Sequence, residues 1–272
     1  MIFLPEDRES CEELWRSAPD WGAGARPLAE IIVAVGRRFL DAPYEAGTLE
    51  RAGAEELVVN LRAFDCVTFV ESTVALARTI RAGRTGFADF AAALERIRYR
   101  GGRRRGYPSR LHYFADWLRD NERKGIVRDI TAEIGGSPFR KPFHALTDRR
   151  AEHPALEDAR AWACMRQVES LCSRRTLFQI AKADLTRVAD RIADGDIIAI
   201  ATDEEGLDVC HTGFAVHYRG RLHLLHASSK AGRVILSEMT LGRYLRSNSS
   251  RTGIIVGRPL PEARFKPGLV KG

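Results

Sequence analysis

Residues 58–71 read VVNLRAFDCVTFVE and contain the start of the clearest helical pattern in the chain. Asp65 is a good N-cap residue, and no proline interrupts the stretch before Gly83, a residue type favoured just past a helix end. An apolar stripe at helical spacing is formed by Val67, Val70, Val74 and Ala77, and Phe69, Thr73 and Leu76 widen it. We predict a helix over residues 65–82 that is buried on much of its surface, with Cys66 at its start.

A cysteine at a helix start has two properties that suit a nucleophile. The positive end of the helix dipole favours the thiolate form of Cys66, which attacks carbonyl carbon. The unpaired backbone N–H groups of the same turn can hold the oxyanion of a tetrahedral intermediate. The alternative is that Cys66 is a small buried apolar residue with no chemical role.

The last hundred residues change from helical to strand patterns. The predicted strands cover residues 196–202, 209–218, 222–227, 234–236 and 253–256, and Arg219 and Gly220 form a two-residue turn. The earlier part of the chain predicts two helices within residues 11–41, and others over 65–82, 87–97 and 109–121. Helices followed by an antiparallel sheet indicate an α+β fold.

Two histidines lie on one face of the predicted hairpin. With the turn at Arg219 and Gly220, Gly213 lies opposite His226, and His211 is one diagonal step from His226. Diagonal Cβ atoms are roughly 7–8 Å apart, within reach of two imidazoles. Gly213 has no side chain and leaves the space between the rings open. Solvated or internally hydrogen-bonded histidines are the alternative interpretation.

A metal site is a rival use of the same histidine pair. It would need a third ligand, such as Asp208 or Cys210. Cys210 points to the opposite face of the strand from His211, which disfavours this hypothesis. We therefore predict no metal and no organic cofactor.

Composition narrows the class of protein further. The 272 residues suit one large domain, or one domain with a large insertion, and the apolar runs of about five residues are too short to cross a membrane. Five cysteines without a CxxC spacing do not indicate a disulfide scaffold or a zinc ribbon. The N-terminus has neither a basic start nor a long apolar segment, so the sequence predicts no signal peptide.

The net charge of +7 suggests an acidic partner, and arginines crowd one segment. These are Arg96, Arg98, Arg100, Arg103, Arg104, Arg105 and Arg110, with Gly101, Gly102 and Gly106 between them. Such a stretch resembles RGG-type nucleic-acid binders, but only two tyrosines interleave and no RNA-binding motif accompanies it. We predict a solvated basic loop and no nucleic-acid partner; attraction of anionic peptide stems or of a lipid surface is the next interpretation.

Several ordered motifs resemble the NlpC-type cell-wall peptidases, a branch of the papain-like cysteine hydrolases. The matching motifs are Phe64-Asp65-Cys66, Gly195-Asp196-Ile197-Ile198, His211-Thr212-Gly213 and His226-Ala227-Ser228, together with LDAPYEAGTLE at 40–50. Three longer blocks, at 58–71, 109–117 and 206–218, look like domains described as N-acetylmuramoyl-L-alanine amidase-like. The resemblance covers roughly residues 30–257.

The resemblance implies an enzyme with a papain-like (NlpC-type) α+β fold in a single domain over residues 1–272, with a core of about 30–257 and an insertion of about 99–190. Cys66 would be the nucleophile that forms a thioester, His211 the general base and His226 the residue that orients His211. Asp65 and the Cys66 backbone would form the helix cap and oxyanion site. The substrate would be peptidoglycan or muropeptide fragments, cut between N-acetylmuramic acid and L-alanine. A γ-D-Glu–diamino acid endopeptidase and a non-catalytic wall-binding or nucleic-acid-binding protein are the alternatives.

The resemblance also suggests substrate-binding residues. In SRLHYFADW (109–117), Arg110 could pair with a carboxylate, while Tyr113 or Trp117 could stack on a sugar. The remaining predicted substrate-binding residues are His112, Tyr44 and Ser228. The alternative for the 109–117 block is that its apolar residues are core and His112 is a buried hydrogen-bonding residue. The family resemblance implies a periplasmic or secreted protein, and the lack of a signal peptide leaves a cytoplasmic protein as the other expectation.

Overall fold

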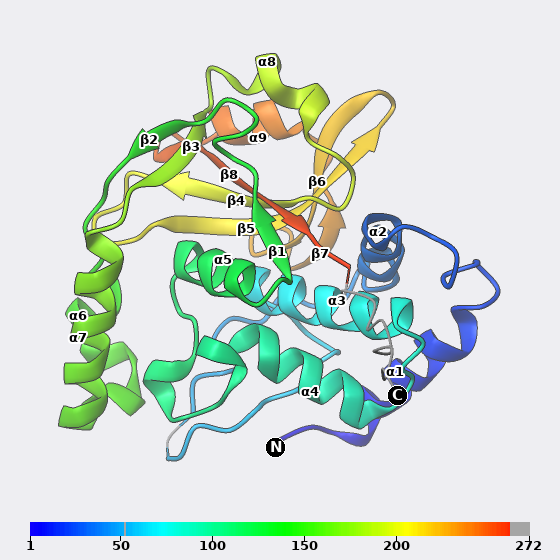
Figure 1. Cartoon of the computed structure of the whole chain (residues 1–272), viewed down its shortest axis with the longest axis horizontal. Helices are drawn as coiled ribbons and strands as arrows, with labels where there is room; N and C mark the ends of the chain where they lie inside the picture. The colour runs from blue at the N-terminus through cyan, green and yellow to red at the C-terminus, as the bar shows by residue number, and fades with distance from the viewer. Residues whose placement is uncertain (52, 262–272) are drawn as a thin grey trace, which may run out of the picture.

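The computed structural model describes residues 1–51 and 53–261. Helices and strands are labelled in Figure 1. The helices are α1 (Pro5–Ser17), α2 (Leu28–Arg38), α3 (Cys66–Arg81), α4 (Phe87–Arg98), α5 (Phe114–Arg123), α6 (Ala145–Asp148), α7 (Ala159–Ser173), α8 (Leu185–Val188) and α9 (Leu241–Arg246). The strands are β1 (Val127–Asp129), β2 (Ser137–Phe139), β3 (Leu177–Ala181), β4 (Ile197–Thr202), β5 (Val209–Tyr218), β6 (Arg221–Ser228), β7 (Arg233–Leu236) and β8 (Arg251–Pro259).

One antiparallel sheet forms the centre of the molecule. Its strand order is β2-β3-β8-β4-β5-β6-β7, and β1 pairs with β8. The β5–β6 hairpin turns at Arg219 and Gly220, which both have positive φ angles. Such a turn matches the right-handed twist of the flanking strands. The predicted α+β class and the predicted hairpin are confirmed.

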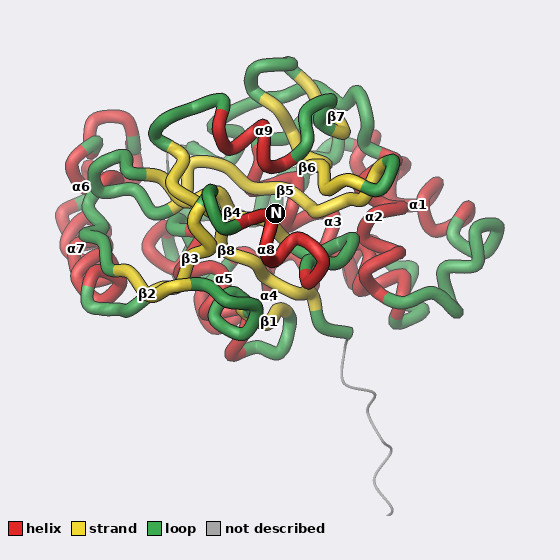
Figure 2. The backbone as a smooth tube through the Cα atoms, turned by 90° about the horizontal axis from the view of Figure 1, so that it is seen from above, coloured by secondary structure: helices red, strands yellow, loops and turns green. Residues whose placement is uncertain are grey.

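The sheet separates two layers of helices. In Figure 1, α3, α4 and α5 lie below the sheet, and α8 and α9 lie above it. The lower layer buries Phe69 and Val70 of α3 against Phe214 of β5. The upper layer buries Leu241 and Leu245 of α9 against the opposite face. Figure 2, viewed from above, shows α9 beside β6. Each face of the central strands is therefore covered by apolar side chains.

The predicted nucleophile helix is confirmed as α3. The Asp65 carboxylate accepts a hydrogen bond from the Thr68 N–H (2.7 Å), and the Thr68 hydroxyl accepts one from the Asp65 N–H (2.9 Å). This reciprocal pair is a capping box, which satisfies backbone N–H groups that the helix itself leaves without a partner. It determines where the helix begins, and so it places Cys66 in the first turn.

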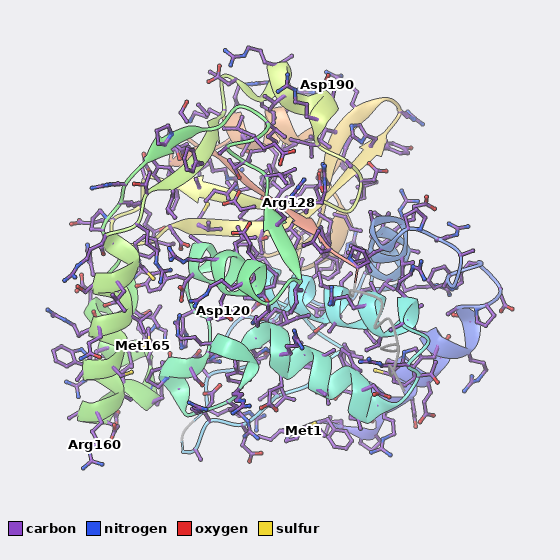
Figure 3. All side chains as sticks on the ribbon, in the orientation of Figure 1. Met1, Asp120, Arg128, Arg160, Met165 and Asp190 are labelled. Atoms are coloured by element: carbon purple, nitrogen blue, oxygen red, sulfur yellow. The ribbon has the colours of Figure 1, made fainter. Side chains whose placement is uncertain are left out.

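The segment 99–190, predicted as an insertion, contributes to the same sheet. It supplies β1, β2 and β3, short strands that the sequence analysis did not predict. It also contains α7, which lies at one side of the molecule, with Arg160 exposed at its outer end (Figure 3). The domain boundaries themselves stay a prediction.

The predicted helix over 109–121 begins later than expected, at Phe114. The residues before it run extended, because Tyr99 and Arg110 form an antiparallel bridge and the Leu111 N–H donates to the Arg98 carbonyl. This backbone pairing competes with helix formation over 109–113. Within the described part of the chain, no helix is both long and apolar enough to span a lipid bilayer.

Candidate active site

The two histidines on the β5–β6 hairpin are in direct contact. His211 Nε2 lies 2.6 Å from His226 Nδ1, and the two rings meet edge to face with centroids 4.7 Å apart. His226 is buried and His211 is half-buried. The predicted proximity of the two imidazoles is therefore confirmed, and a hydrogen bond joins them.

Gly213 makes this contact sterically feasible. A Cβ atom at position 213 would lie 2.8 Å from the His226 Cβ and 2.7 Å from the Leu225 carbonyl oxygen. Real Cβ atoms do not approach neighbours that closely, so any side chain at this position would push β6 away. The lack of a side chain at position 213 therefore allows β5 and β6 to pack closely beside the two histidines.

Cys66 lies against the same strand. The backbone N–H of Thr212, the residue that follows His211, is directed at the Cys66 sulfur, as is the N–H of Cys66 itself. The thiol is half-buried. The first turn of α3 and the beginning of β5 therefore meet at the sulfur atom.

The resting thiol is protonated, contrary to the prediction of a thiolate. Burial raises the pKa of Cys66 to about 12, and the nearby negative charge of Asp65 adds to this rise. The two N–H groups directed at the sulfur lower the thiol pKa, but their effect is smaller than that of burial. The helix start supplies the expected donors, while desolvation of the anion dominates.

The two imidazoles are neutral in the resting protein. Burial lowers the pKa of His211 to about 3, and the neighbouring His226 and the positive charge of Arg251 lower it further. Burial and Arg251 lower the pKa of His226 to about 4. A neutral imidazole can accept a proton, so His211 is available as a base throughout the neutral range.

The contact between the rings restricts their tautomers. Since His211 uses Nε2 toward His226, its Nδ1 is the ring nitrogen left for another partner. If that Nδ1 is to accept a proton, Nε2 must carry hydrogen and donate to His226 Nδ1. His226 then carries its own hydrogen on Nε2, a buried atom without a hydrogen-bond partner in the described part of the chain.

Tyr44, predicted to bind substrate, interacts electrostatically with Cys66. Burial raises the pKa of Tyr44 to about 12, and the neighbouring Cys66 and Asp65 contribute. The backbone of Tyr44 is held by a bridge to Phe64 and by a 2.8 Å hydrogen bond from its N–H to the Gly232 carbonyl. The phenol therefore lies within electrostatic range of the sulfur.

Ser228, also predicted to bind substrate, serves a turn. Its side chain is buried, and its hydroxyl oxygen accepts a 3.1 Å hydrogen bond from the Ala231 N–H. This contact stabilises the turn between β6 and β7. The serine hydroxyl is thus engaged within its own hairpin.

Arg110 does not face substrate, which corrects the prediction of a carboxylate-binding role. Its guanidinium is buried, lies 2.6 Å from Glu50 and 3.6 Å from Glu55, and stacks over Tyr107 at 4.8 Å. Two internal carboxylates already satisfy its charge. The residue connects the 107–111 segment to the loop around residue 50.

The aromatic residues of the 109–117 block are also internal, so the predictions that they stack on a sugar are wrong. Trp117 is fully buried, and its indole N–H donates to Glu71 at 3.1 Å. The Tyr113 hydroxyl is buried and donates to Glu169 at 2.7 Å. The structure favours the alternative, in which this block belongs to the core.

His112 is also an internal residue, as the alternative interpretation of the 109–117 block expects. Its Nε2 lies 3.0 Å from the Tyr107 carbonyl oxygen, and its ring lies 4.3 Å from the Tyr107 ring. Burial lowers the pKa of His112 to about 3. It is thus a neutral hydrogen-bonding residue within the core rather than a substrate ligand.

Two residues beside the histidines were not predicted from the sequence. The Tyr244 ring of α9 lies 6.1 Å from the His211 ring and 5.4 Å from the His226 ring. The Arg251 guanidinium covers the Tyr244 ring at 4.0 Å. No local motif marks either residue, because α9 and the start of β8 reach this position only through the folding of the sheet.

The proposed third metal ligands are engaged elsewhere. The Asp208 carboxylate accepts a 2.6 Å hydrogen bond from the Ala115 N–H at the start of α5. The Cys210 sulfur lies 3.6 Å from the Ile200 carbonyl oxygen. Across residues 1–51 and 53–261, no three His, Cys, Asp or Glu side chains are grouped as metal ligands would be.

The arginine-rich segment is partly integrated into the fold. Arg104 donates to the Glu55 carbonyl, and Arg100 pairs with Asp116 at 2.7 Å. Asp120, labelled in Figure 3, accepts hydrogen bonds from the Gly101 N–H. Several of its arginines therefore hold this loop against α5 and the loop around residue 55.

Comparison with protein families identifies one match. Residues 34–254 match the model of a family described as N-acetylmuramoyl-L-alanine amidase-like. The comparison with curated proteins finds no match.

Solved structures show the same architecture. An N-acetylmuramoyl-L-alanine amidase from Bacteroides uniformis is 36% identical over 85% of this chain and 98% of its own, with a TM-score of 0.81. A protein from Bacteroides fragilis, described as a candidate xylanase, is 38% identical over 83% of this chain and 99% of its own, with a TM-score of 0.79. A Legionella pneumophila protein is 21% identical over 94% of this chain and 95% of its own, with a TM-score of 0.70, and it is similar in fold.

Proposed function

The chain belongs to the N-acetylmuramoyl-L-alanine amidase-like family, and from that premise we propose that it is a cysteine-dependent amidase. The substrate is peptidoglycan or a muropeptide fragment, and the bond is the amide between the lactyl group of N-acetylmuramic acid and L-alanine. Cys66 is the nucleophile, His211 the general base and His226 the residue that orients His211.

One observation carries this proposal. The 2.6 Å contact between His211 and His226 lies beside a cysteine in the first turn of a helix, with the Thr212 N–H directed at its sulfur. A nucleophile, a base and a group that orients the base are the parts that acyl transfer requires. The arrangement of a cysteine helix against an antiparallel sheet also supports a papain-like, NlpC-type fold.

The first half of the reaction forms a thioester. Nδ1 of His211 accepts the proton of the Cys66 thiol while the sulfur attacks the lactyl carbonyl carbon. The N–H groups at the start of α3 stabilise the resulting oxyanion, because the first turn of a helix leaves them without helical partners. The imidazolium then donates its proton to the nitrogen of L-alanine, and the carbon–nitrogen bond breaks.

The second half restores the enzyme. Water attacks the thioester and gives a proton to His211, the carbon–sulfur bond breaks, and the thiol recovers its proton. His226 accepts from His211 throughout and keeps Nδ1 of His211 directed away from itself. Because the resting thiol and imidazole are both neutral, proton transfer is expected to accompany attack rather than to precede it.

Mass spectrometry of products from defined disaccharide–peptide fragments tests the proposal. Wild type should release an intact peptide that begins with L-alanine, and Cys66→Ala should release none. Cys210→Ala is the matched control, because it removes a thiol one residue from His211 and should keep activity. Cleavage after D-Glu would replace the amidase by the endopeptidase alternative, and no cleavage of any fragment would favour a binding protein.

A peptidoglycan substrate also bears on where the protein works. We propose that it acts in the periplasm or outside the cell, where the intact wall lies. Cell fractionation with an antibody against the chain tests this localisation. Recovery only in the cytoplasmic fraction would instead favour the processing of wall fragments inside the cell.

A further inference from the structure

Arg251 is a cation placed beside the two histidines without an acidic partner. Its guanidinium donates to the Tyr244 carbonyl and to the Ser247 hydroxyl (3.1 Å), and it stacks on the Tyr244 ring at 4.0 Å. Within the described part of the chain, no carboxylate lies at ion-pairing distance from it. The contrast is Arg110, whose buried guanidinium lies close to two glutamates.

The position of Arg251 makes the proposed protonation of His211 electrostatically unfavourable. Burial is the main cause of the lowered pKa values of His211 and His226, and the charge of Arg251 lowers both further by opposing protonation. General-base catalysis requires His211 to become an imidazolium, so an uncompensated cation nearby slows that step. A negative charge that enters with the substrate would remove this penalty.

We propose that Arg251, held on the Tyr244 ring, binds a carboxylate of the stem peptide and thereby makes cleavage depend on an anionic substrate. The inference rests on the proposed function, since it names which part of the muropeptide the site requires. A guanidinium binds a carboxylate through two parallel hydrogen bonds, and stacking on a tyrosine restricts its orientation. Tyr244 is a positioning residue, because its ring carries the guanidinium and also lies beside both histidine rings.

Several charged or titratable groups surround His211, and each of them can affect how kcat/KM depends on pH. His226 and Arg251 act on His211 directly. Tyr244 lies against its ring; burial raises the pKa of its phenol, Arg251 lowers it, and the neighbouring Cys210 and Cys66 raise it. Of these groups, Arg251 is the permanent cation, so its removal should raise the pKa of the acid limb of kcat/KM.

The test compares two substrates and matched variants. The substrates are N-acetylmuramoyl-L-Ala-D-Glu and the same compound with both carboxyl groups converted to carboxamides. Wild type should prefer the carboxylate substrate in kcat/KM by about 10–100-fold, the range of a charge-assisted hydrogen bond. Arg251→Gln should abolish this preference, Arg251→Lys should keep part of it, and Arg243→Gln, an exposed arginine on α9, should leave it unchanged.

The outcomes separate this inference from the proposed function. If wild type cleaves both substrates equally, or if Arg251→Gln keeps the preference in a protein of unchanged Tm, the inference is overturned. If wild type cleaves neither substrate, the proposed function fails. Calorimetric titration with L-Ala-D-Glu and its diamide then decides the role of Arg251: carboxylate-dependent binding that Arg251→Gln removes supports the inference, and equal binding of both compounds overturns it.

Discussion

The ion pair between α3 and α4 lends itself to a quantitative test. Glu71 lies on the same helix as Cys66, and its carboxylate receives a 2.6 Å hydrogen bond from Arg98 and a 3.1 Å one from the Trp117 indole. Both members of the pair are almost fully buried. Arg98→Met would leave the Glu71 carboxylate buried, with the Trp117 indole as its remaining side-chain donor among residues 1–51 and 53–261.

The expected loss of stability follows from the cost of an uncompensated buried charge. Removing one partner of a buried pair costs about 3–5 kcal/mol. At roughly 2.1 cal/mol/K per residue, 272 residues correspond to an unfolding entropy of about 0.57 kcal/mol/K. Arg98→Met should therefore lower Tm by roughly 5–9 °C. Arg96→Met, an exposed neighbour on α4, should change stability by no more than about 0.5 kcal/mol.

Scanning calorimetry at several pH values provides the assay. Burial already raises the pKa of Glu71 with Arg98 present, and loss of Arg98 should raise it further. A carboxyl group whose pKa is raised by folding stabilises the folded state when the pH is below its pKa in the unfolded chain, near 4.3. This stabilisation is lost as the pH rises through its pKa in the folded protein. The Tm deficit of Arg98→Met should thus be larger at pH 8 than at pH 5.

A double variant completes the test. Glu71→Gln combined with Arg98→Met removes both charges and should recover part of the lost stability, because a buried pair adds little over neutral residues. A deficit below about 1 kcal/mol in Arg98→Met, or a double variant no more stable than the single one, would refute the reasoning about this pair.

Four further predictions concern the candidate site. His226→Ala should lower kcat by roughly 10²–10⁴-fold with little change in KM, measured by steady-state hydrolysis, since the base loses its orienting partner; an unchanged kcat would remove His226 from the mechanism. Gly213→Ala should cost about 1–3 kcal/mol in urea unfolding and abolish hydrolysis, because the added Cβ overlaps β6; a fully active variant would contradict the packing argument. The kcat/KM profile should lose activity on acidification only as pH approaches about 3, where His211 becomes protonated, and a limb near 6.5 would show that its pKa is not lowered. Iodoacetamide at pH 7 should modify the exposed Cys164 faster than Cys66, as measured by mass spectrometry of the labelled peptides. Faster labelling of Cys66 would restore the hypothesis that its resting form is the thiolate.

Local patterns predicted the elements that carry the chemistry. The Asp65 cap and the apolar stripe behind it are properties of a few consecutive residues, and α3 begins where they indicate. The two-residue turn at Arg219 and Gly220 sets the register of β5 on β6. Because successive side chains of a strand point to opposite faces of the sheet, this register determines which side chains share a face. The contact between His211 and His226 follows from that register.

Partners far apart in the chain were decided by tertiary structure. Arg110 looks like a substrate ligand in isolation, but folding brings Glu50 and Glu55 to its guanidinium. The strands β1, β2 and β3 are too short for a periodic pattern to show, and they exist because β8 and its neighbours supply hydrogen-bonding partners. Pairings over such distances leave no local signature.

The candidate nucleophile, Cys66, also has some properties that neighbouring residues determine and others that the tertiary structure determines. Its position in the first turn of a helix depends on adjacent residues and is legible in the amino-acid order alone. The ionisation of Cys66 and the placement of Tyr244 and Arg251 beside His211 depend on what the fold packs around them. Hydrogen-bond caps and strand registers act over a few residues, whereas desolvation and long-range charge act through space, and only the folded chain defines that space.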